Sequence, residues 1–267
     1  MARAMIQGLL REGFVASQLR VGEPVAAQRE ALVREYGVTA LADNRAVVTG
    51  AGLVVLAVKP QQVPELLSGL AATLARQCPL LLSIAAGLRV ADLAALCPGL
   101  PIVRAMPNRA ALVGAGATAL YATPGVDPAA RALAAQLCGT AGLAVWVERE
   151  SDLDIVTALS GSGPAYFFLL AEHLAAAAVA QGLDAGTAQL LARQTLCGAG
   201  ALAAGAMTLA EQREAVTSKG GTTDAALAAL QAGGFDKLVT AAVAAATHRS
   251  AELAAQLGRP RAASAPD

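Results

Sequence analysis

The stretch LVVLAVKP (Leu53–Pro60) is the clearest indication of the fold, because it contains a predicted buried strand and the proline that ends it. Its first six residues are apolar without interruption, which is typical of a strand buried on both faces of a parallel sheet. Pro60 then ends the run, since proline cannot donate a hydrogen bond to a strand ladder. The pattern is repeated along the chain by a helical segment over 64–77, LLLSIAAG (80–87), a helical segment over 90–96 and IVRAMPN (102–108). Strands that alternate with helices predict a mostly parallel α/β sheet.

The same alternation extends in both directions from this stretch. Toward the N-terminus it predicts a strand over Gln18–Gly22 and a helix over Pro24–Gly37, with proline in the first turn. Toward the C-terminus it predicts strands over 117–122 and 144–148 that flank a helix over 128–142. We therefore expect a nucleotide-binding domain over residues 1–150. Such sheets bind ligands at the carboxyl ends of their strands, so the turns there are the candidate sites.

The second half of the chain has a different periodicity. From Asp152 onward we find no strand pattern, and helices are predicted over Asp152–Leu183, Ala185–Met207 and Phe235–Leu257. They are rich in alanine and apolar on more than one face, so they should be buried inside a domain or against another subunit. We expect a helical substrate or dimerisation domain over 151–258 and a disordered tail over 259–267.

Composition excludes several classes of protein. The 267 residues have a net charge of zero, so no basic stripe indicates a nucleic-acid or anionic membrane partner. No uncharged apolar run reaches the roughly 18–20 residues of a membrane helix, and the first residues do not form a signal peptide. A soluble cytoplasmic protein is the expectation.

The four cysteines and two histidines do not form a metal-binding pattern. No two cysteines are close enough for a C-x-x-C site, so we expect no metal. Small buried hydrophobic residues in a reducing compartment are the favoured interpretation of the cysteines.

Three turns follow predicted strands and are weak signals singly. Lys59 could lie near an anionic cofactor or be an ordinary solvated lysine. AAG (Ala85–Gly87) allows the backbone to approach a flat ligand, or is an ordinary tight turn. After MP, Asn108 could orient a carboxamide or a ring, but turns use Pro-Asn routinely.

SGSGPAY (Ser160–Tyr166) interrupts a helical pattern with two glycines and a proline. Helix propensity makes this unfavourable by ~1 kcal/mol per glycine and ~3 kcal/mol for the proline. A kink or a close backbone approach would explain the segment. Tight helix–helix packing is the structural alternative, and the two are compatible.

VTSKGGTT (Val216–Thr223) precedes another helical run. Glycines before a helix start leave backbone N–H groups that can bind a carboxylate or a phosphate. The alternative is a plain helix start capped by a serine or threonine hydroxyl.

Taken together, AVKPQ, AAG, MPN, TALSGSGPAYFF and VTSKGGTT, in this order and spacing, resemble the pyrroline-5-carboxylate reductase family. AGGFDKL and RSAELAAQLG also fit, and the resemblance covers Met1–Gly258. It implies a Rossmann-type N-terminal domain and an all-helical C-terminal domain that interlocks into homodimers, often assembled into decamers. It also implies reduction of the small molecule 1-pyrroline-5-carboxylate to L-proline by NADPH or NADH, the last step of proline biosynthesis.

The resemblance assigns roles to individual residues. Those expected to bind the cofactor are Asn44, Ala57, Val58, Lys59, Pro60, Ala85, Ala86 and Asn108. Those expected to bind the substrate are Glu150, Gly221, Thr222 and Thr223. Backbone N–H groups of the two threonines would hold the carboxylate, and the Thr223 hydroxyl would contact the ring nitrogen as the catalytic group.

The chemistry agrees with this set of residues. Hydride transfer to a C=N bond needs no nucleophile and no metal, and positioning of two rings can supply up to ~7–11 kcal/mol of the catalysis. His173 and His248 fall on predicted helices and receive no role.

The first residues, MARAMIQGLL, look like the helix that in this family follows the first strand and its glycine-rich turn. We therefore expect that strand and the phosphate-binding glycines to be missing, which would expose a groove in the sheet and remove the main phosphate site. A truncated gene product or a misassigned start is the preferred hypothesis. A short form with lost activity, a non-catalytic remnant that still dimerises, is the alternative.

Other questions stay open from the sequence. Arg109 and Lys219 stand where the family usually has threonine and proline, and they either strengthen anion binding or point into solvent. Glu23 could hold a ribose diol and favour NADH, whereas Asn44 suits either cofactor. A related reductase for another imine or keto acid is a third possible function.

Overall fold

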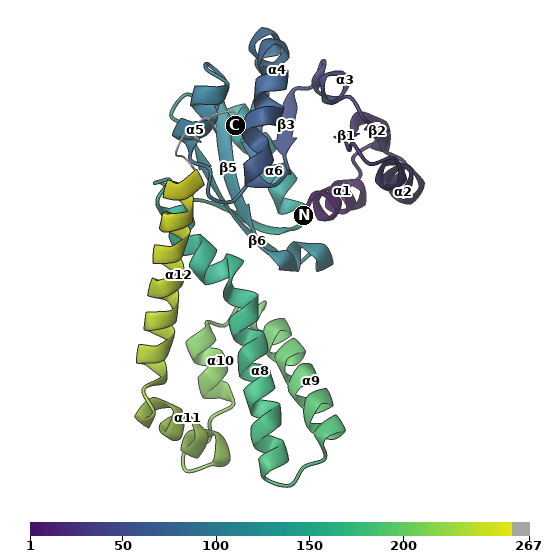
Figure 1. Cartoon of the computed structure of the whole chain (residues 1–267). Coiled ribbons are helices and arrows are strands. Elements are labelled where there is room, and N and C mark those ends of the chain that lie inside the picture. The colour runs from purple at the N-terminus through teal and green to yellow at the C-terminus, as the bar shows by residue number, and fades with distance from the viewer. Residues whose placement is uncertain (258–267) are drawn as a thin grey trace, which may run out of the picture. The chain divides into compact units, whose positions relative to one another are not determined.

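The computed structural model describes residues 1–257, so the tail expected over 259–267 lies outside the described residues. Two compact units make up the chain (Figure 1): Met1–Gly161 with Ala246–Asp267, and Ser162–Ala245. The first unit contains the sheets, and the second is helical. The boundary expected at residue 150 stays a prediction.

A five-stranded mixed sheet forms the centre of the first unit. Its order is β3 (Leu53–Leu56), β4 (Leu80–Ser83), β5 (Ile102–Pro107), β6 (Gly116–Ala122) and β7 (Gly142–Trp146). Neighbouring strands are parallel except for β5 and β6, where Val103 pairs with Ala122 in the antiparallel sense. This confirms the mostly parallel sheet. The one reversal occurs where a connection without a crossover helix joins two strands, which only antiparallel pairing allows.

Helices cover both faces of this sheet. Helices α4 (Val63–Gln77) and α5 (Val90–Leu96) pack on one face, with Leu67 against a cluster that contains Leu81. Helices α1 (Ala2–Arg11) and α6 (Pro128–Gly139) pack on the other face, with Met5 in a cluster that contains Leu82. All four residues of β4 are buried, as alternate side chains of a doubly covered strand must be.

Strand β3 differs from the prediction made for it. Leu53 and Val55 are only half-buried, whereas Val54 and Leu56 are buried. The prediction of burial on both faces therefore holds only in part for β3. Val54 and Leu56 are buried on one face, whereas Leu53 and Val55 pack against the cluster on the other face and stay half-buried.

A separate parallel pair, β1 (Arg20–Gly22) and β2 (Thr39–Leu41), lies before β3 in the chain. Within residues 1–257, neither strand pairs with β3. Helix α2 (Ala26–Tyr36) connects the two strands, and α3 (Asn44–Val48) follows β2. Sequence periodicity missed β2 and α3 because elements of three and five residues are too short to show a repeat.

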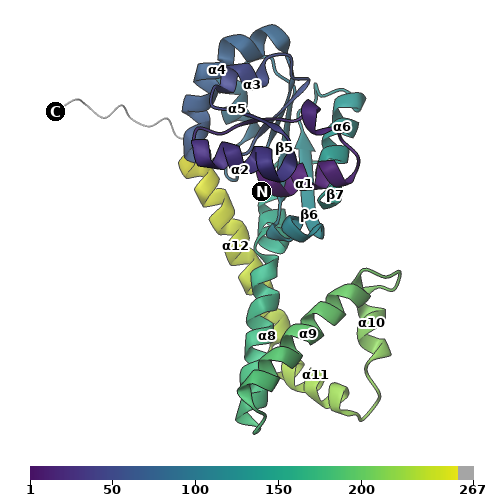
Figure 2. The ribbon, with the colours of Figure 1, turned by 90° about the vertical axis from the view of Figure 1, so that its right-hand side faces the viewer.

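The second unit contains α8 (Gly163–Ala180), α9 (Ala185–Ala203), α10 (Leu209–Ala215), α11 (Thr222–Ala232) and the first part of α12 (Phe235–Leu257). Helices α8 and α9 lie side by side, whereas α10 and α11 extend away from this pair (Figure 2). The helix predicted over Asp152–Leu183 is not continuous. A π turn over Thr157–Gly161 separates α7 (Asp152–Val156) from α8, at the glycines that interrupt the helical pattern.

Helix α8 is apolar and largely uncovered in the single chain. The stretch Asp152–Ala180 is the one segment of residues 1–257 that is long and apolar enough to cross a membrane, which is weak evidence for a span. Only 11% of its most apolar window is buried. Its large exposed side chains include Phe167, Phe168, Leu169 and Leu174.

Replacing Gly142 with alanine should destabilise the first unit. Gly142 has φ 140°, and a Cβ there would overlap the backbone N and O of its partner Gly116 on β6. We expect Gly142→Ala to lower the free energy of unfolding by about 1–3 kcal/mol through overpacking. The measurement is denaturant unfolding at matched protein concentration.

Gly139→Ala is the matched control, because a Cβ at Gly139 in α6 meets nothing within 4 Å. There the better helix propensity of alanine should leave stability equal or raise it by up to ~1 kcal/mol. Equal midpoints for Gly142→Ala and the native chain would contradict the close approach of β6 and β7.

Candidate active site

Except for Asn44, the predicted cofactor residues of the first unit lie in loops at one edge of the five-stranded sheet. Strands β3, β4 and β5 are parallel, so the loops after Leu56, Ser83 and Pro107 leave from the same carboxyl edge. The loop after β3 contains Ala57, Val58, Lys59 and Pro60; the loop after β4 contains Ala85 and Ala86; Asn108 directly follows β5. Tertiary structure thus brings together three turns that were weak signals singly.

The loop after β4 is held in a tight turn. The hydroxyl of Ser83, which is 1% exposed, accepts a hydrogen bond from the Ala85 N–H at 3.3 Å. Gly87 has φ 81°, a left-handed conformation that favours glycine, and a Cβ there would lie 2.7 Å from Leu257 Cδ1 of α12. Ala86 stays exposed at the turn, while Ala85 is buried.

These loops fit a flat anionic dinucleotide. Ala57 and Ala86 are exposed and small enough for close approach, and Lys59 is an exposed cation that makes no ion pair with any residue in 1–257. Asn44 is the first residue of α3, and a Cβ at Gly22 on β1 would overlap its Oδ1. Asn44 therefore lies beside the end of β1, a strand of the separate two-stranded sheet.

Asn108 uses its side-chain amide inside the protein. It is 8% exposed, its Oδ1 accepts a hydrogen bond from the Ala117 N–H, and its Nδ2 donates to the Ser160 carbonyl, both at 3.1 Å. Asn108 thereby joins the loop after β5 to the π turn. Its expected contact with the cofactor stays a prediction.

Side chains support the π turn itself. The hydroxyls of Thr157 and Ser160 donate to the carbonyls of Leu153 and Val156 at 2.7 and 3.1 Å. A Cβ at Gly161 would lie 3.0 Å from Met106 Cε, so the backbone at Gly161 lies against the Met106 side chain of β5. Single π turns inside α-helices occur often at functional sites.

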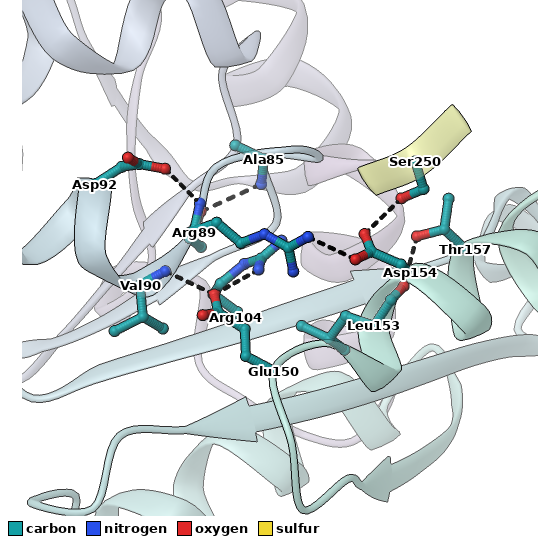
Figure 3. Close-up of polar contacts among 11 residues, drawn as sticks. Ala85, Arg89, Val90, Asp92, Arg104, Glu150, Leu153, Asp154, Thr157 and Ser250 are labelled. Carbon is teal, nitrogen blue, oxygen red and sulfur yellow. Dashed lines mark hydrogen bonds and ion pairs between the residues drawn. The ribbon is translucent and has the colours of Figure 1, made fainter. Parts of the chain in front are cut away.

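Four charged residues form two ion pairs in the first unit (Figure 3). Arg104 Nη1 on β5 donates to Glu150 Oε1 at 2.6 Å, and Arg89 Nη2 donates to Asp154 Oδ2 at 2.6 Å. Glu150 Oε1 also accepts from the Val90 N–H at 2.6 Å. Glu150 was expected to contact the substrate, which stays a prediction, and the structure places its carboxylate on two groups of the protein.

Sequence reasoning missed Arg89, Arg104 and Asp154. The one available signal was Arg104, a charged residue within the apolar run IVRAMP of a strand expected to be buried. A charge in such a strand is rarely buried without a partner. The identity of that partner could not be read locally, since Glu150 lies 46 residues away.

Gly221, Thr222 and Thr223 meet at the start of α11, in the second unit. The Gly220 N–H donates to Asp224 Oδ2 at 2.8 Å, and the Gly221 N–H donates to the Ser218 carbonyl at 2.9 Å. The N-cap residue is Gly221, which has no side chain, so the alternative of a hydroxyl-capped start was wrong. The first N–H groups of α11 can thus serve an anion, as the resemblance expects.

Cysteine and histidine chemistry has no support in the described part of the chain. Residues 1–257 contain no group of three or more His, Cys, Asp or Glu side chains that could hold a metal. Burial raises the pKa of the Cys97 thiol and raises that of Cys138 to about 12. Cys78 and Cys197 are exposed, so the expectation that the cysteines are buried was wrong for these two.

Thiol alkylation should distinguish the two kinds of cysteine. The reactive species is the thiolate, and the raised pKa of Cys138 leaves almost none at a pH of about 8. Iodoacetamide should label Cys78 in the native protein and Cys138 only after unfolding, as read by peptide mass spectrometry. Labelling of both at equal rates would contradict the burial of Cys138.

Truncating Asn108 should destabilise the first unit. Asn108→Ala leaves the Ala117 N–H and the Ser160 carbonyl without their side-chain partner, and each unsatisfied group costs about 1–3 kcal/mol. Denaturant unfolding measures the loss, with Gln28→Ala on the exposed face of α2 as the control. A loss no greater than that of the control would show that the amide does not hold the π turn.

Comparison with known proteins supports the family that the sequence resembles. The family model for pyrroline-5-carboxylate reductase dimerisation matches residues 150–253, and the model for NADP oxidoreductase, coenzyme F420-dependent, matches residues 1–87. The pyrroline-5-carboxylate reductase of Pseudomonas aeruginosa is 44% identical over 261 residues, which is 97% of this chain and 95% of that protein.

Two solved structures share the fold along the chain. A pyrroline-5-carboxylate reductase from Coxiella burnetii superposes with a TM-score of 0.91 at 37% identity, and the match covers 94% of each chain. A Plasmodium falciparum pyrroline carboxylate reductase with NADP bound superposes with a TM-score of 0.77 at 25% identity, again over 94% of each chain. The chain belongs to the pyrroline-5-carboxylate reductase family.

Proposed function

We propose that this chain reduces 1-pyrroline-5-carboxylate to L-proline with NADPH or NADH, as the last step of proline biosynthesis. The observation that carries the proposal is 44% identity to the Pseudomonas aeruginosa reductase over 97% of the chain. The loops at the carboxyl edge of β3, β4 and β5 and the start of α11 supply the two kinds of site that the reaction needs.

The cofactor, when bound, supplies the hydride. Lys59 and the small residues Ala57, Val58, Pro60, Ala85 and Ala86 would hold it at the carboxyl edge of the sheet, with Asn44 on the side of β1 and Asn108 after β5. The P. falciparum relative with NADP bound and the match to an NADP oxidoreductase model support this assignment.

The substrate-side roles belong to α11. The N–H groups of Thr222 and Thr223 would bind the carboxylate, and Gly221 lets the chain approach closely. The Thr223 hydroxyl would donate a hydrogen bond to the ring nitrogen and so stabilise the negative charge that develops there as hydride adds to the imine carbon. The resemblance alone assigns Glu150 to the substrate side, and its carboxylate accepts hydrogen bonds from Arg104 and from the Val90 N–H.

The competing functions have less support. A non-catalytic remnant is not favoured, because the chain covers 95% of the length of the P. aeruginosa reductase. Glu23 would favour NADH if its carboxylate held a ribose diol, but Glu23 Oε1 accepts a hydrogen bond from the Val25 N–H at 2.9 Å. We propose that both NADH and NADPH are used. Arg109 and Lys219 are exposed, and we propose that they are available to anions.

We also propose a cytoplasmic homodimer or larger homo-oligomer such as a decamer. Phe167, Phe168 and Leu190 are 60%, 58% and 70% exposed in the single chain. Apolar side chains exposed to this extent are unfavourable in water and favour association with another apolar surface. The dimerisation model covers the helices that carry these side chains.

The direct test is oxidation of NADPH and of NADH that depends on 1-pyrroline-5-carboxylate. We expect turnover with the native chain, and we expect Thr223→Val to lower kcat/KM about tenfold to a hundredfold, since a hydrogen bond to a charged group contributes about 1.5–3 kcal/mol. Thr49→Val, at an exposed hydroxyl at the end of α3, is the control. No turnover by the pure native oligomer with either cofactor would refute the proposed function.

A further inference from the structure

Arg89, Arg104, Glu150 and Asp154 form a cluster that we call the charge clasp (Figure 3). Its side chains are well covered: Arg104 is 8% exposed, Asp154 10%, Glu150 23% and Arg89 27%. Each carboxylate accepts two hydrogen bonds. Glu150 Oε1 accepts from Arg104 and from the Val90 N–H, and Asp154 accepts from Arg89 and from the Ser250 hydroxyl.

The charge clasp joins four segments that are distant in sequence. Arg104 belongs to β5, Asp154 to α7 and Ser250, which donates to Asp154, to α12, while Glu150 lies two residues before α7. Arg89 ends the loop that follows β4, and its N–H donates to Asp92 Oδ2 at 2.8 Å. Two carboxylates, those of Asp92 and Glu150, therefore fix consecutive N–H groups at the point where this loop becomes α5.

That loop also carries Ala85 and Ala86, which are proposed to line the cofactor. Its other end is held by the Ser83 hydroxyl on the Ala85 N–H, and its middle by the packing of Gly87 against α12. The clasp completes the restraint at the Arg89–Val90 end. The placement of the two alanines relative to β5 and α7 thus depends on Glu150.

Stability alone gives a weak reason for such a cluster. Moving paired charges out of water costs several kcal/mol per ion, and well-packed apolar residues of similar volume are often as stabilising. The nearby pair Arg149–Asp152 shows the contrast, because Arg149 is 75% exposed and joins residues three apart. What the clasp adds is directed hydrogen bonding to one backbone N–H.

We propose that Glu150 is a positioning residue that acts through Val90 and Arg104, and not by direct contact with the substrate. Its carboxylate fixes the position of the loop Ala85–Arg89. The rate of the proposed reduction depends on the position of that loop. The inference rests on the proposed function. It replaces the substrate contact that the resemblance assigns to Glu150 with an indirect role.

The test uses the full chain with Glu150→Gln, Glu150→Met, Arg104→Met and the double variant Glu150→Met/Arg104→Met. Arg149→Gln is the matched control for loss of a nearby exposed ion pair. For each we measure amide hydrogen exchange over residues 84–92, thermal stability, and kcat and KM for both substrates. The double variant guards against misfolding, since it leaves no buried charge without its partner.

We expect the double variant to regain most of the stability that either methionine variant loses. It should still show faster exchange at Val90 and a kcat reduced about tenfold to a hundredfold, because small displacements of positioning groups have effects of that size. Glu150→Gln should retain most of its turnover, because the amide oxygen can still accept from the Val90 N–H.

Two results would overturn the inference. If kcat returned together with stability in the double variant, the clasp would be structural only. If Glu150→Gln raised the KM for the imine while exchange at 84–92 stayed native, Glu150 would contact the substrate. Absence of turnover by the native chain would refute the proposed function instead, and hydrogen exchange would still decide whether Glu150 holds the loop.

Discussion

Burial of β4 on both faces is the constraint on which the rest of the first unit depends. Leu81 and Leu82 are fully buried in clusters on opposite faces of the sheet, one with α4 and α5 and the other with α1 and α6. A strand covered on both sides needs neighbours that satisfy its backbone groups, and β3 and β5 are parallel to it. Parallel neighbours place the loops after all three strands at one edge. The candidate cofactor residues share a site for that reason.

Polar contacts then determine how the segments around this edge are held. Asn108 joins the loop after β5 to the π turn, and the charge clasp joins the loop after β4 to β5, α7 and α12. Among residues 1–257 every buried side-chain nitrogen or oxygen has at least one hydrogen-bond partner. Satisfied buried networks restrict a structure to one arrangement. Positioning catalysis, which needs no nucleophile, depends on such an arrangement.

The second unit follows a different physical rule. Its helices bury few of their side chains against one another. Alanine-rich faces with exposed phenylalanine and leucine side chains remain uncovered in the single chain. An apolar surface of this kind explains why a helix of a reductase family also has the length and composition of a membrane span. Composition measures only how apolar a helix is. Whether lipid or protein covers it depends on the partner.

The alternation of strands and helices, the helical second half and the family could all be inferred from the sequence. Periodicity, proline and glycine act over a few residues, so Leu53–Leu56, Val90–Leu96 and the start of α11 could be located without coordinates. Only the tertiary structure decided that β5 and β6 run antiparallel, that β3 has a single neighbour, and that Glu150 lies on Arg104. Those facts depend on which segments meet after folding, and the partners Asn108–Ser160 and Arg89–Asp154 are 52 and 65 residues apart. A local sequence pattern cannot identify partners so far apart along the chain, because their hydrogen bonds form only after the core has brought the two segments together.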